Sequence, residues 1–216
     1  MKKIASPLFQ DLSEAELDTL AAAGHLRTRQ FAKHEVIFRA GSCVREIGIV
    51  LRGSVHIENL DLWGTKSILS SVGAGQAFAE TYAFCGDALM VDAVAAEHSE
   101  ILFLHTAAFT DARIEPALKD KLLRRLLAVS MRKNLSLSQR IFCTTPKTVR
   151  GRLLTYFSAQ AARCGRMEFE VPFNRQQMAD YLNLDRSALS KELCKMRDEG
   201  LLEFDKNRFV LKQLPE

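Results

Sequence analysis

The sequence has no long apolar run and no clustered cysteines. No apolar segment approaches the ~20 residues of a transmembrane helix, and Gln10 and Asp11 interrupt the apolar stretch behind the basic start. We therefore expect neither a membrane span nor a signal peptide. The five cysteines are odd in number and none are paired at CxxC spacing, which argues against a disulfide framework and a zinc finger. We expect small buried side chains in a reduced cytosol, with redox sensing as the alternative.

The signatures of common catalytic sites are also missing. The sequence contains no GxSxG, HExxH or GxxxxGK[ST] motif, so we expect no catalytic residues, no metal site and no enzymatic activity. The five histidines, at positions 25, 34, 56, 98 and 105, are scattered. A lone histidine in a β domain is more often structural than a haem ligand, so we do not expect haem. A haem- or thiol-based sensor stays open as an alternative.

Charge is divided unevenly along the chain, whose net charge is +4. Residues 1–112 carry 9 basic and 14 acidic side chains, residues 113–142 carry 8 and 2, and residues 143–216 carry 13 and 10. An acidic front and a basic back indicate that only the C-terminal part meets a polyanion.

Short β-rich runs separated by glycine dominate residues 31–104. The glycines at 41, 53, 64, 75 and 86 stand 12, 11, 11 and 11 residues apart. This spacing predicts a compact antiparallel sandwich or barrel. Gly53 and Gly64 are predicted to bracket a hairpin with the loop NLDLWG. Ahead of this region, Ser13 and Glu16 form a capping-box pattern for a helix that Gly24 ends.

A long helix is predicted over residues 111–140. Its apolar residues recur at steps of four, four, four and three between positions 114 and 129. Such a helix would bury its stripe against a partner, most simply a second copy of the chain. Packing on its own sheet is the alternative. The predicted dimer residues are Leu118, Leu122, Leu126 and Val129. Pro146 then breaks the pattern, with Thr144 or Thr145 as the cap of the next helix.

Residues 174–204 carry the pattern of two short helices joined by a tight turn. Asn174 and Gln177 form a capping box at the start of the first helix. Asp185 caps the second helix, which Gly200 ends, and a hairpin or wing follows. Two helices joined in this way, with a basic and polar face on the second, predict a DNA-binding helix-turn-helix.

The second helix places its polar and basic side chains opposite its core stripe. Arg186, one residue after the cap, can present a guanidinium fork to guanine O6 and N7. Asn174, Gln176 and the amides beside them suit phosphate oxygens. The predicted base-reading residues are Arg186, Ser187, Ser190 and Lys191.

The stretch FNRQQMADYLNLDRSALSKELCKMRDEGLLEF resembles the winged helix-turn-helix of the Crp/Fnr transcription regulators, and LRGSVHIENLDLWGTKSILSSVGAGQAFAE resembles their β-roll. The resemblance covers nearly the whole chain, in the order of the family. It implies an α+β fold with an N-terminal antiparallel β-roll (a cupin-like jelly roll), a long dimerisation helix and a C-terminal winged helix-turn-helix. The corresponding domains are residues 1–112, 113–142 and 143–216.

The resemblance implies a cytoplasmic homodimer that binds a near-palindromic promoter site on double-stranded DNA. RNA polymerase is a further expected partner, and no membrane is. The family's base-reading positions fall on Arg186, Ser187 and Lys191, although many members have glutamate where Ser187 stands. The expected phosphate-contacting residues are Asn174, Arg175, Gln176, Lys195 and Lys206. A ligand-binding module that lacks DNA binding is the rival interpretation.

The resemblance also implies a small effector in the β-roll. Cyclic-nucleotide binders of the family show Gly-Glu and then Arg-Ser, where this chain has Ala79-Glu80 and Met90-Val91. A buried phosphate would therefore lack its guanidinium, whose charged hydrogen bond is worth ~1.5–3 kcal/mol. We expect an effector other than cyclic AMP, such as a small organic or aromatic ligand, or a cavity filled by the chain's own side chains. The expected pocket residues are Phe78, Glu80, Thr81, Met90, Val91, Lys133 and Asn134.

Overall fold

The computed structural model describes residues 4–60 and 66–212. The chain divides into two compact units, Met1–Arg132 and Lys133–Glu216, and the long helix α3 (Pro116–Thr144) contributes to both. The three-part division predicted at residues 112 and 142 stays a prediction. None of the helices in the described part of the chain has the length and hydropathy of a membrane span.

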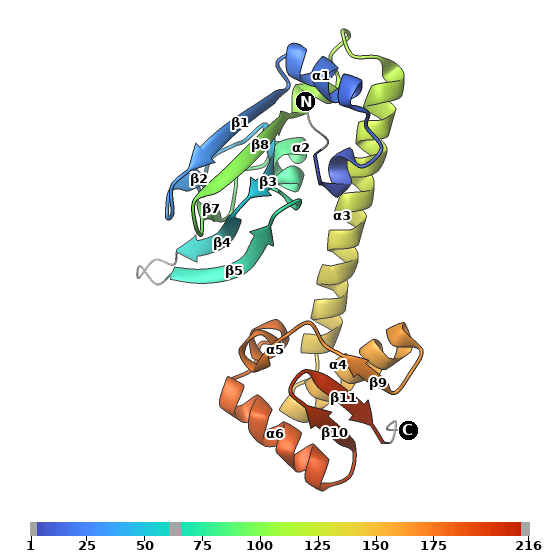
Figure 1. The fold of residues 1–216 in the computed structure, drawn as a ribbon. Helices are drawn as coiled ribbons and strands as arrows, with labels where there is room; N and C mark the ends of the chain where they lie inside the picture. The colour runs from blue at the N-terminus through green and yellow to red at the C-terminus, as the bar shows by residue number, and fades with distance from the viewer. Residues whose placement is uncertain (1–3, 61–65, 213–216) are drawn as a thin grey trace. The chain divides into compact units, whose positions relative to one another are not determined.

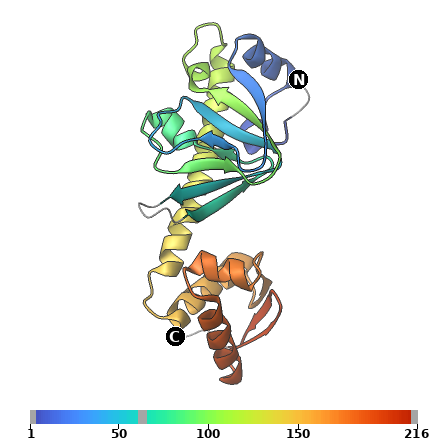
Figure 2. The same cartoon turned by 90° about the vertical axis from the view of Figure 1, so that its left-hand side faces the viewer.

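The first unit contains two four-stranded antiparallel sheets, with strand orders β1-β8-β3-β6 and β2-β7-β4-β5 (Figure 1 and Figure 2). The strands are β1 (Leu26–Phe31), β2 (Val36–Phe38), β3 (Glu46–Arg52), β4 (Ser54–Leu60), β5 (Lys66–Gly73), β6 (Ala77–Phe78), β7 (Asp92–Ala95) and β8 (Ser99–His105). The helices of this unit, besides its part of α3, are η1 (Pro7–Phe9), α1 (Glu14–Ala22), α2 (Glu80–Cys85) and η2 (Thr106–Phe109). The predicted β4–β5 hairpin is present, and residues 61–65 of its loop lie outside the described residues.

The sheet that contains β3 and β8 is covered on both faces. Its side chains point alternately to one face and the other, and each set lies in a different core. Ile47 and Ile49 of β3 pack with the short N-terminal helices and the start of α3. Val50 of β3 and Phe103 of β8 lie in a second core, which also takes residues from the other sheet. Alternate residues of a strand point to opposite faces, so one strand supplies both cores.

Phenylalanine rings pack against one another in the core between the two sheets. Phe38 lies 5.8 Å from Phe78 and 5.7 Å from Phe103, measured between ring centroids, and Phe31 lies 6.1 Å from Phe103. A side chain at position 48 would force the ring of Phe78 to move, because a Cβ atom at Gly48 would lie 2.3 Å from Cζ of Phe78. These contacts make the rings part of the core between the sheets, and whether an effector cavity lies beside them stays a prediction.

The predicted dimer stripe on α3 requires a correction. Leu118, Leu122 and Leu126 are buried within their own unit, where they join the core formed by the N-terminal helices and the β3–β8 sheet. Val129 is half-buried. The exposed apolar residues of α3 in this unit are instead Leu123, Leu127 and Met131, which are 47%, 55% and 55% exposed.

Two further expectations differ from the structure. Of the five cysteines only Cys143 is buried, and the other four are exposed. The helix after the break, α4 (Val149–Cys164), is capped by Thr148, whose side chain accepts a hydrogen bond from the amide of Gly151. Neither Thr144 nor Thr145 caps it, because α3 itself continues to Thr144.

The second unit contains the end of α3, three further helices and a small antiparallel sheet with strand order β10-β11-β9. Its elements after α4 are β9 (Glu168–Glu170), α5 (Arg175–Leu182), α6 (Arg186–Asp198), β10 (Leu202–Asp205) and β11 (Arg208–Leu211). Their apolar residues form one core around Tyr156, Phe157 and Phe209. The two units together confirm the predicted α+β class with a β-roll, a long helix and a winged helix-turn-helix.

Candidate nucleic-acid interface

Helices α5 and α6 are joined by a turn that the sequence specifies locally. Asn174 and Gln177 form the predicted capping box, in which each side chain accepts a hydrogen bond of 2.9 Å from the other residue's amide. Asn183 ends α5 in a left-handed conformation (φ 53°), which asparagine tolerates better than most residues. The amide of Leu184 then donates to the carbonyl oxygen of Ala179 at 2.9 Å, which closes the turn.

Two arginines from other helices fix this turn. Arg152 of α4 donates to the carbonyl oxygens of Leu182 and Asn183, at 3.1 and 2.7 Å. Arg140 of α3 donates to those of Asp180 and Tyr181, at 3.0 and 3.1 Å. The carbonyl groups at the end of a helix lack partners within the helix, so the two guanidinium groups satisfy them and complement the helix dipole.

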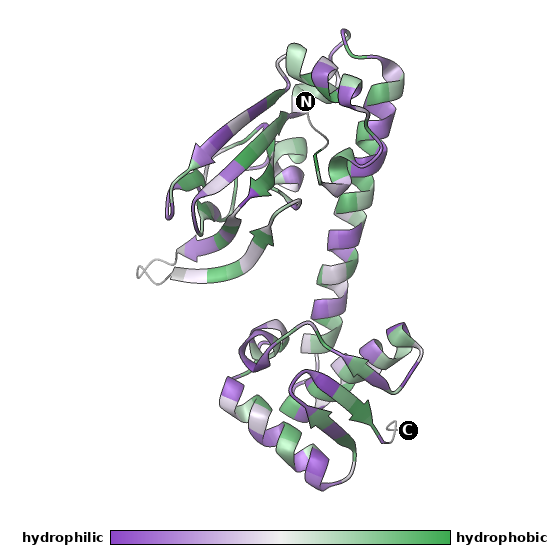
Figure 3. Cartoon of the chain, in the orientation of Figure 1, coloured by the Kyte–Doolittle hydropathy of each residue, from purple (hydrophilic) through white to green (hydrophobic). Residues whose placement is uncertain are grey.

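Helix α6 is amphipathic and presents its polar face to solvent. Both polar and hydrophobic residues occur along it (Figure 3). Leu189, Leu193 and Met196 are fully buried. The predicted DNA-contacting residues Arg186, Ser187, Lys191 and Lys195 are exposed, and Ser190 is half-buried. Arg150 of α4 anchors the helix through ion pairs with Glu192 and Glu199. The polar face is therefore exposed to solvent while the opposite face packs into the core and Arg150 ties the helix to α4.

Ser187 also hydrogen-bonds to the capping residue Asp185, a contact that was not predicted from the sequence. Its hydroxyl donates to Asp185 Oδ1 at 2.5 Å, and the same oxygen accepts from the amides of Ser187 and Ala188 at 2.8 and 3.0 Å. These bonds, led by that of the Ser187 hydroxyl, lower the pKa of the Asp185 carboxyl group. With its proton directed at the cap, the Ser187 hydroxyl has only its lone pairs left, so it could act toward a further partner as an acceptor, as a base amino group would require.

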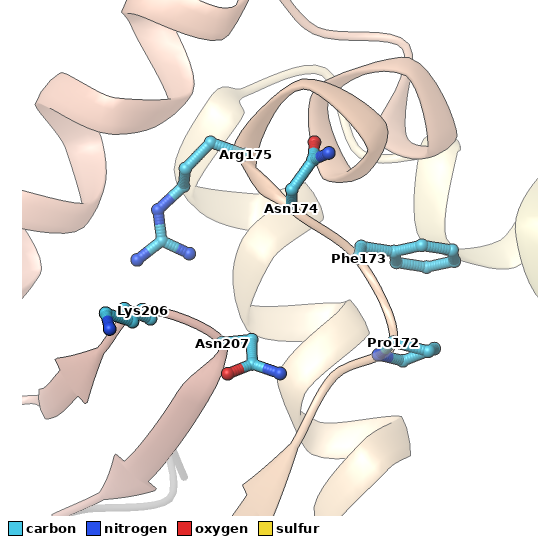
Figure 4. A pocket seen from close by; sticks show the side chains of 6 residues that line it. All are labelled: Pro172, Phe173, Asn174, Arg175, Lys206 and Asn207. Atoms are coloured by element: carbon cyan, nitrogen blue, oxygen red, sulfur yellow. The ribbon is translucent and has the colours of Figure 1, made fainter.

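The predicted phosphate contacts at the start of α5 are partly engaged within the protein. Gln176 Nε2 donates to Asp180 Oδ1 at 2.9 Å, and the side-chain oxygen of Asn174 accepts the capping bond. Asn174 still has its side-chain NH₂ group to donate. Arg175 extends from the start of α5 toward the wing turn that carries Lys206 and Asn207 (Figure 4).

A hollow with a volume of about 500 Å³ lies between the start of α5 and the wing turn. Its walls are Pro172, Phe173, Asn174, Arg175, Lys206 and Asn207. Three predicted phosphate-contacting residues, Asn174, Arg175 and Lys206, thus come together although 30 residues separate the last two in sequence. Asn207 was missed, and the only signal for it was the short turn DKN between the wing strands. Lys195 lies apart from the hollow, on α6.

The residues predicted for the effector pocket are spread over different environments. Phe78 and Glu80 are buried, Val91 is half-buried and Thr81 is exposed. Met90 is 77% exposed and so does not line the interior of the β-roll. Lys133 and Asn134 are exposed on the part of α3 that belongs to the second unit.

Three of the histidines have partners, and His56 Nδ1 lies 3.7 Å from Glu58 Oε1. His25 Nε2 lies 2.7 Å from Asp111 Oδ2, and His105 Nδ1 accepts a hydrogen bond of 3.0 Å from the amide of Ala107. Within residues 4–60 and 66–212, no cluster of three or more histidine, cysteine or acidic side chains has the arrangement of a metal site.

Comparison with known families and structures agrees with both units. Residues 28–113 match the family described as cyclic nucleotide-binding domain, and residues 151–216 match the Crp-like helix-turn-helix domain. No curated protein matches the chain. The catabolite activator protein of Thermus thermophilus is 25% identical over 96% of this chain and 94% of its own, with a TM-score of 0.50.

Two more distant solved structures share the fold. FixK2 from Bradyrhizobium japonicum is 19% identical over 87% of this chain and 93% of its own, with a TM-score of 0.52. The c-di-GMP responsive global regulator CLP of Xanthomonas campestris is 18% identical over 93% of this chain and 100% of its own, with a TM-score of 0.55.

A β-roll of the cyclic nucleotide-binding type followed by a winged helix-turn-helix defines a class of DNA-binding transcription regulators that are not enzymes. The chain belongs to the Crp/Fnr family of these regulators.

Proposed function

We propose that the chain acts as a homodimer that binds a near-palindromic promoter site, under the control of a small effector other than cyclic AMP. The observation that carries the DNA-binding part is the exposed face of α6, where Arg186 follows directly after the Asp185 cap. An arginine at the start of a recognition helix can make a bidentate contact with guanine, worth ~1–3 kcal/mol of discrimination. RNA polymerase is the further proposed partner, and the cytoplasm is the proposed location.

The test of this assignment is the Arg186→Ala variant. We expect specific binding to disappear while weak, salt-sensitive binding to unrelated DNA remains, because phosphate contacts do not depend on the base sequence. Gel shifts with duplexes selected from a random pool measure both. Unchanged affinity for the selected duplexes would remove Arg186 from the base-reading set. Deletion of residues 143–216 tests the rival module, since full biological activity of the truncated chain would support it.

Dimerisation is supported by the exposed apolar face of α3. Leu123, Leu127 and Met131 follow one another at steps of four and are each about half exposed. Residues four apart lie on the same side of a helix, so these side chains form one strip. A second copy that covers the strip would remove it from water and would pair two recognition helices, which a palindromic site with half-sites one DNA turn (~34 Å) apart requires.

The proposed effector is a compact, largely apolar molecule. Met90 stands near the position of the family's phosphate-binding arginine and is exposed. The space between the sheets is lined by phenylalanine rings, which offer no charged partner to a phosphate. CLP is described as c-di-GMP responsive, so within this fold an effector other than cyclic AMP has a precedent. Calorimetric titration with cyclic AMP should show no binding, and mass spectrometry of freshly purified protein should identify the co-purifying ligand.

A thiol-based sensor is the second candidate, because Cys43, Cys85, Cys164 and Cys194 are exposed. Cys194 lies on α6 itself. Loss of DNA binding on mild oxidation, with full recovery on reduction, would favour this candidate. Oxidised protein that binds like the reduced protein would exclude it.

A further inference from the structure

Arg175 is held against the wing by two aromatic rings. Its guanidinium carbon lies 4.9 Å from the ring centroid of Phe204 and 5.1 Å from that of Phe209. The two phenylalanines are direct partners across the β10–β11 hairpin, with ring centroids 6.0 Å apart. One guanidinium therefore spans both strands of the wing, where cation–π attraction to each ring holds it.

The environment of Arg175 is that of a packed side chain. No carboxylate within residues 4–60 and 66–212 forms an ion pair with it. Burial lowers the pKa of its guanidinium below the usual value. Arg197 of α6 also approaches Phe204, at 5.8 Å, but it is exposed and pairs with Asp198. The contact of Arg175 with the wing is thus closer and less solvated than that of its neighbour.

The wing turn that Arg175 holds carries Lys206. This residue adopts a positive φ of 50° in the turn and lines the hollow with Asn174 and Arg175 (Figure 4). At the same hollow, the amides of Arg175 and Gln176 lack partners within the helix and attract anions, whereas the amide of Gln177 donates to the Asn174 cap. A phosphate in the hollow would meet both groups only if the wing turn stays beside the start of α5.

We propose that Arg175 is a positioning residue for DNA binding, which clamps Phe204 and Phe209 and so keeps Lys206 within reach of the phosphate bound at the start of α5. The proposal rests on the DNA binding proposed above. It differs from the expectation that Arg175 is itself a phosphate contact. The planar guanidinium can lie against both rings at once, which a lysine ammonium does less well, whereas a lysine still brings its positive charge to a phosphate.

The Arg175→Lys variant separates the two roles, measured in the full-length chain by fluorescence anisotropy with a duplex selected from a random pool. If Arg175 positions the wing, Arg175→Lys loses the Lys206 contact. Because both protomers of the proposed dimer lose the contact, affinity then falls roughly sixtyfold near 0.1 M salt, and the slope of log K against log salt becomes shallower by about 1.8. Lys206→Gln should produce the same change in the wild-type chain and no further change in Arg175→Lys. Arg197→Lys is the matched control and should bind as the wild type does.

Wild-type affinity and slope in Arg175→Lys, or additive effects of the two substitutions, would overturn the proposal. A readout without DNA distinguishes its failure from failure of DNA binding itself. Amide hydrogen exchange of residues 202–211 should be faster in Arg175→Lys than in the wild type and the Arg197→Lys control. Equal protection of these amides in all three proteins would also overturn the proposal, whether or not the wild type binds DNA.

Discussion

Arg140 on α3 donates a hydrogen bond of 3.1 Å to the carbonyl oxygen of Tyr181, and its guanidinium carbon lies 5.8 Å from the centroid of that tyrosine's ring. A second bond reaches the carbonyl oxygen of Asp180. The end of α3 is thus tied directly to the residues that precede the recognition helix. Under the effector control proposed above, this contact would be a short route from α3 to the helix-turn-helix.

Arg140→Gln should therefore weaken DNA binding without touching a DNA-contacting side chain. The variant leaves two carbonyl groups of α5 without their charged donor, which we expect to cost about 1 kcal/mol of stability at this half-exposed site. Denaturant unfolding and anisotropy measure the two effects. Lys147→Gln, an exposed charge loss nearby, is the control. If both variants behave alike, net charge rather than the tie to the turn determines the result.

Leu127→Glu should convert the dimer to a monomer. The side chain is exposed in the single chain, so the folded unit tolerates a charge there, whereas a covered strip would not. Two copies of a leucine buried at ~1.5 kcal/mol each imply a dimer weakened by roughly a hundredfold or more. Sedimentation at several concentrations tests this. Arg132→Glu, which projects about 100° away from Met131 on the same helix, should leave the dimer intact, and a dimeric Leu127→Glu variant would contradict the proposed interface.

Ala79→Gly should stabilise the first unit. Ala79 precedes α2 with a left-handed φ of 61°, a conformation that costs a residue with a side chain ~1–2 kcal/mol and glycine almost nothing. Allowing for the greater flexibility of glycine in the unfolded chain, we expect a gain of about 0.5–1 kcal/mol, measured by thermal unfolding. Ala83→Gly, inside α2, should instead destabilise. A lower melting temperature for Ala79→Gly would show that the local strain is not limiting.

Tyr156→Phe should leave the second unit as stable as before or more so. Tyr156 is 1% exposed, and its hydroxyl has no hydrogen-bond partner among the residues that the structure describes. Burial raises the pKa of this hydroxyl above the ordinary value for tyrosine. Removal of an unsatisfied buried hydroxyl group avoids a desolvation penalty of ~1–3 kcal/mol. Denaturant titration of this variant beside Tyr181→Phe measures the change, and a clear loss of stability would reveal a partner such as bound water.

Features that depend on neighbours in the sequence could be predicted well. The capping boxes at Ser13 and Asn174 and the cap at Asp185 are all present, because each needs only residues two or three positions apart. The strand β1 was missed: its LRTRQF sequence lacks apolar alternation, and most of its residues are exposed.

Features that depend on which distant part of the chain packs against a residue could not be predicted. A leucine stripe shows that one face of a helix is apolar but not what covers it, so Leu118, Leu122 and Leu126 were assigned to a partner although their own unit buries them. For the same reason the sequence does not show that the Ser187 hydroxyl donates a hydrogen bond to Asp185, or that Arg175 lies against the ring of Phe204.

The ring of Phe78 against Gly48 has a consequence for any molecule that enters the β-roll. A guest that entered between these rings would displace at least one of them, and the work of displacement would be subtracted from its intrinsic affinity. A substitution that empties this space, such as Phe38→Ala, would then tighten binding of the guest while making the unliganded protein less stable. At this cluster of phenylalanines, tighter binding of an effector would therefore come at the expense of the stability of the unliganded protein.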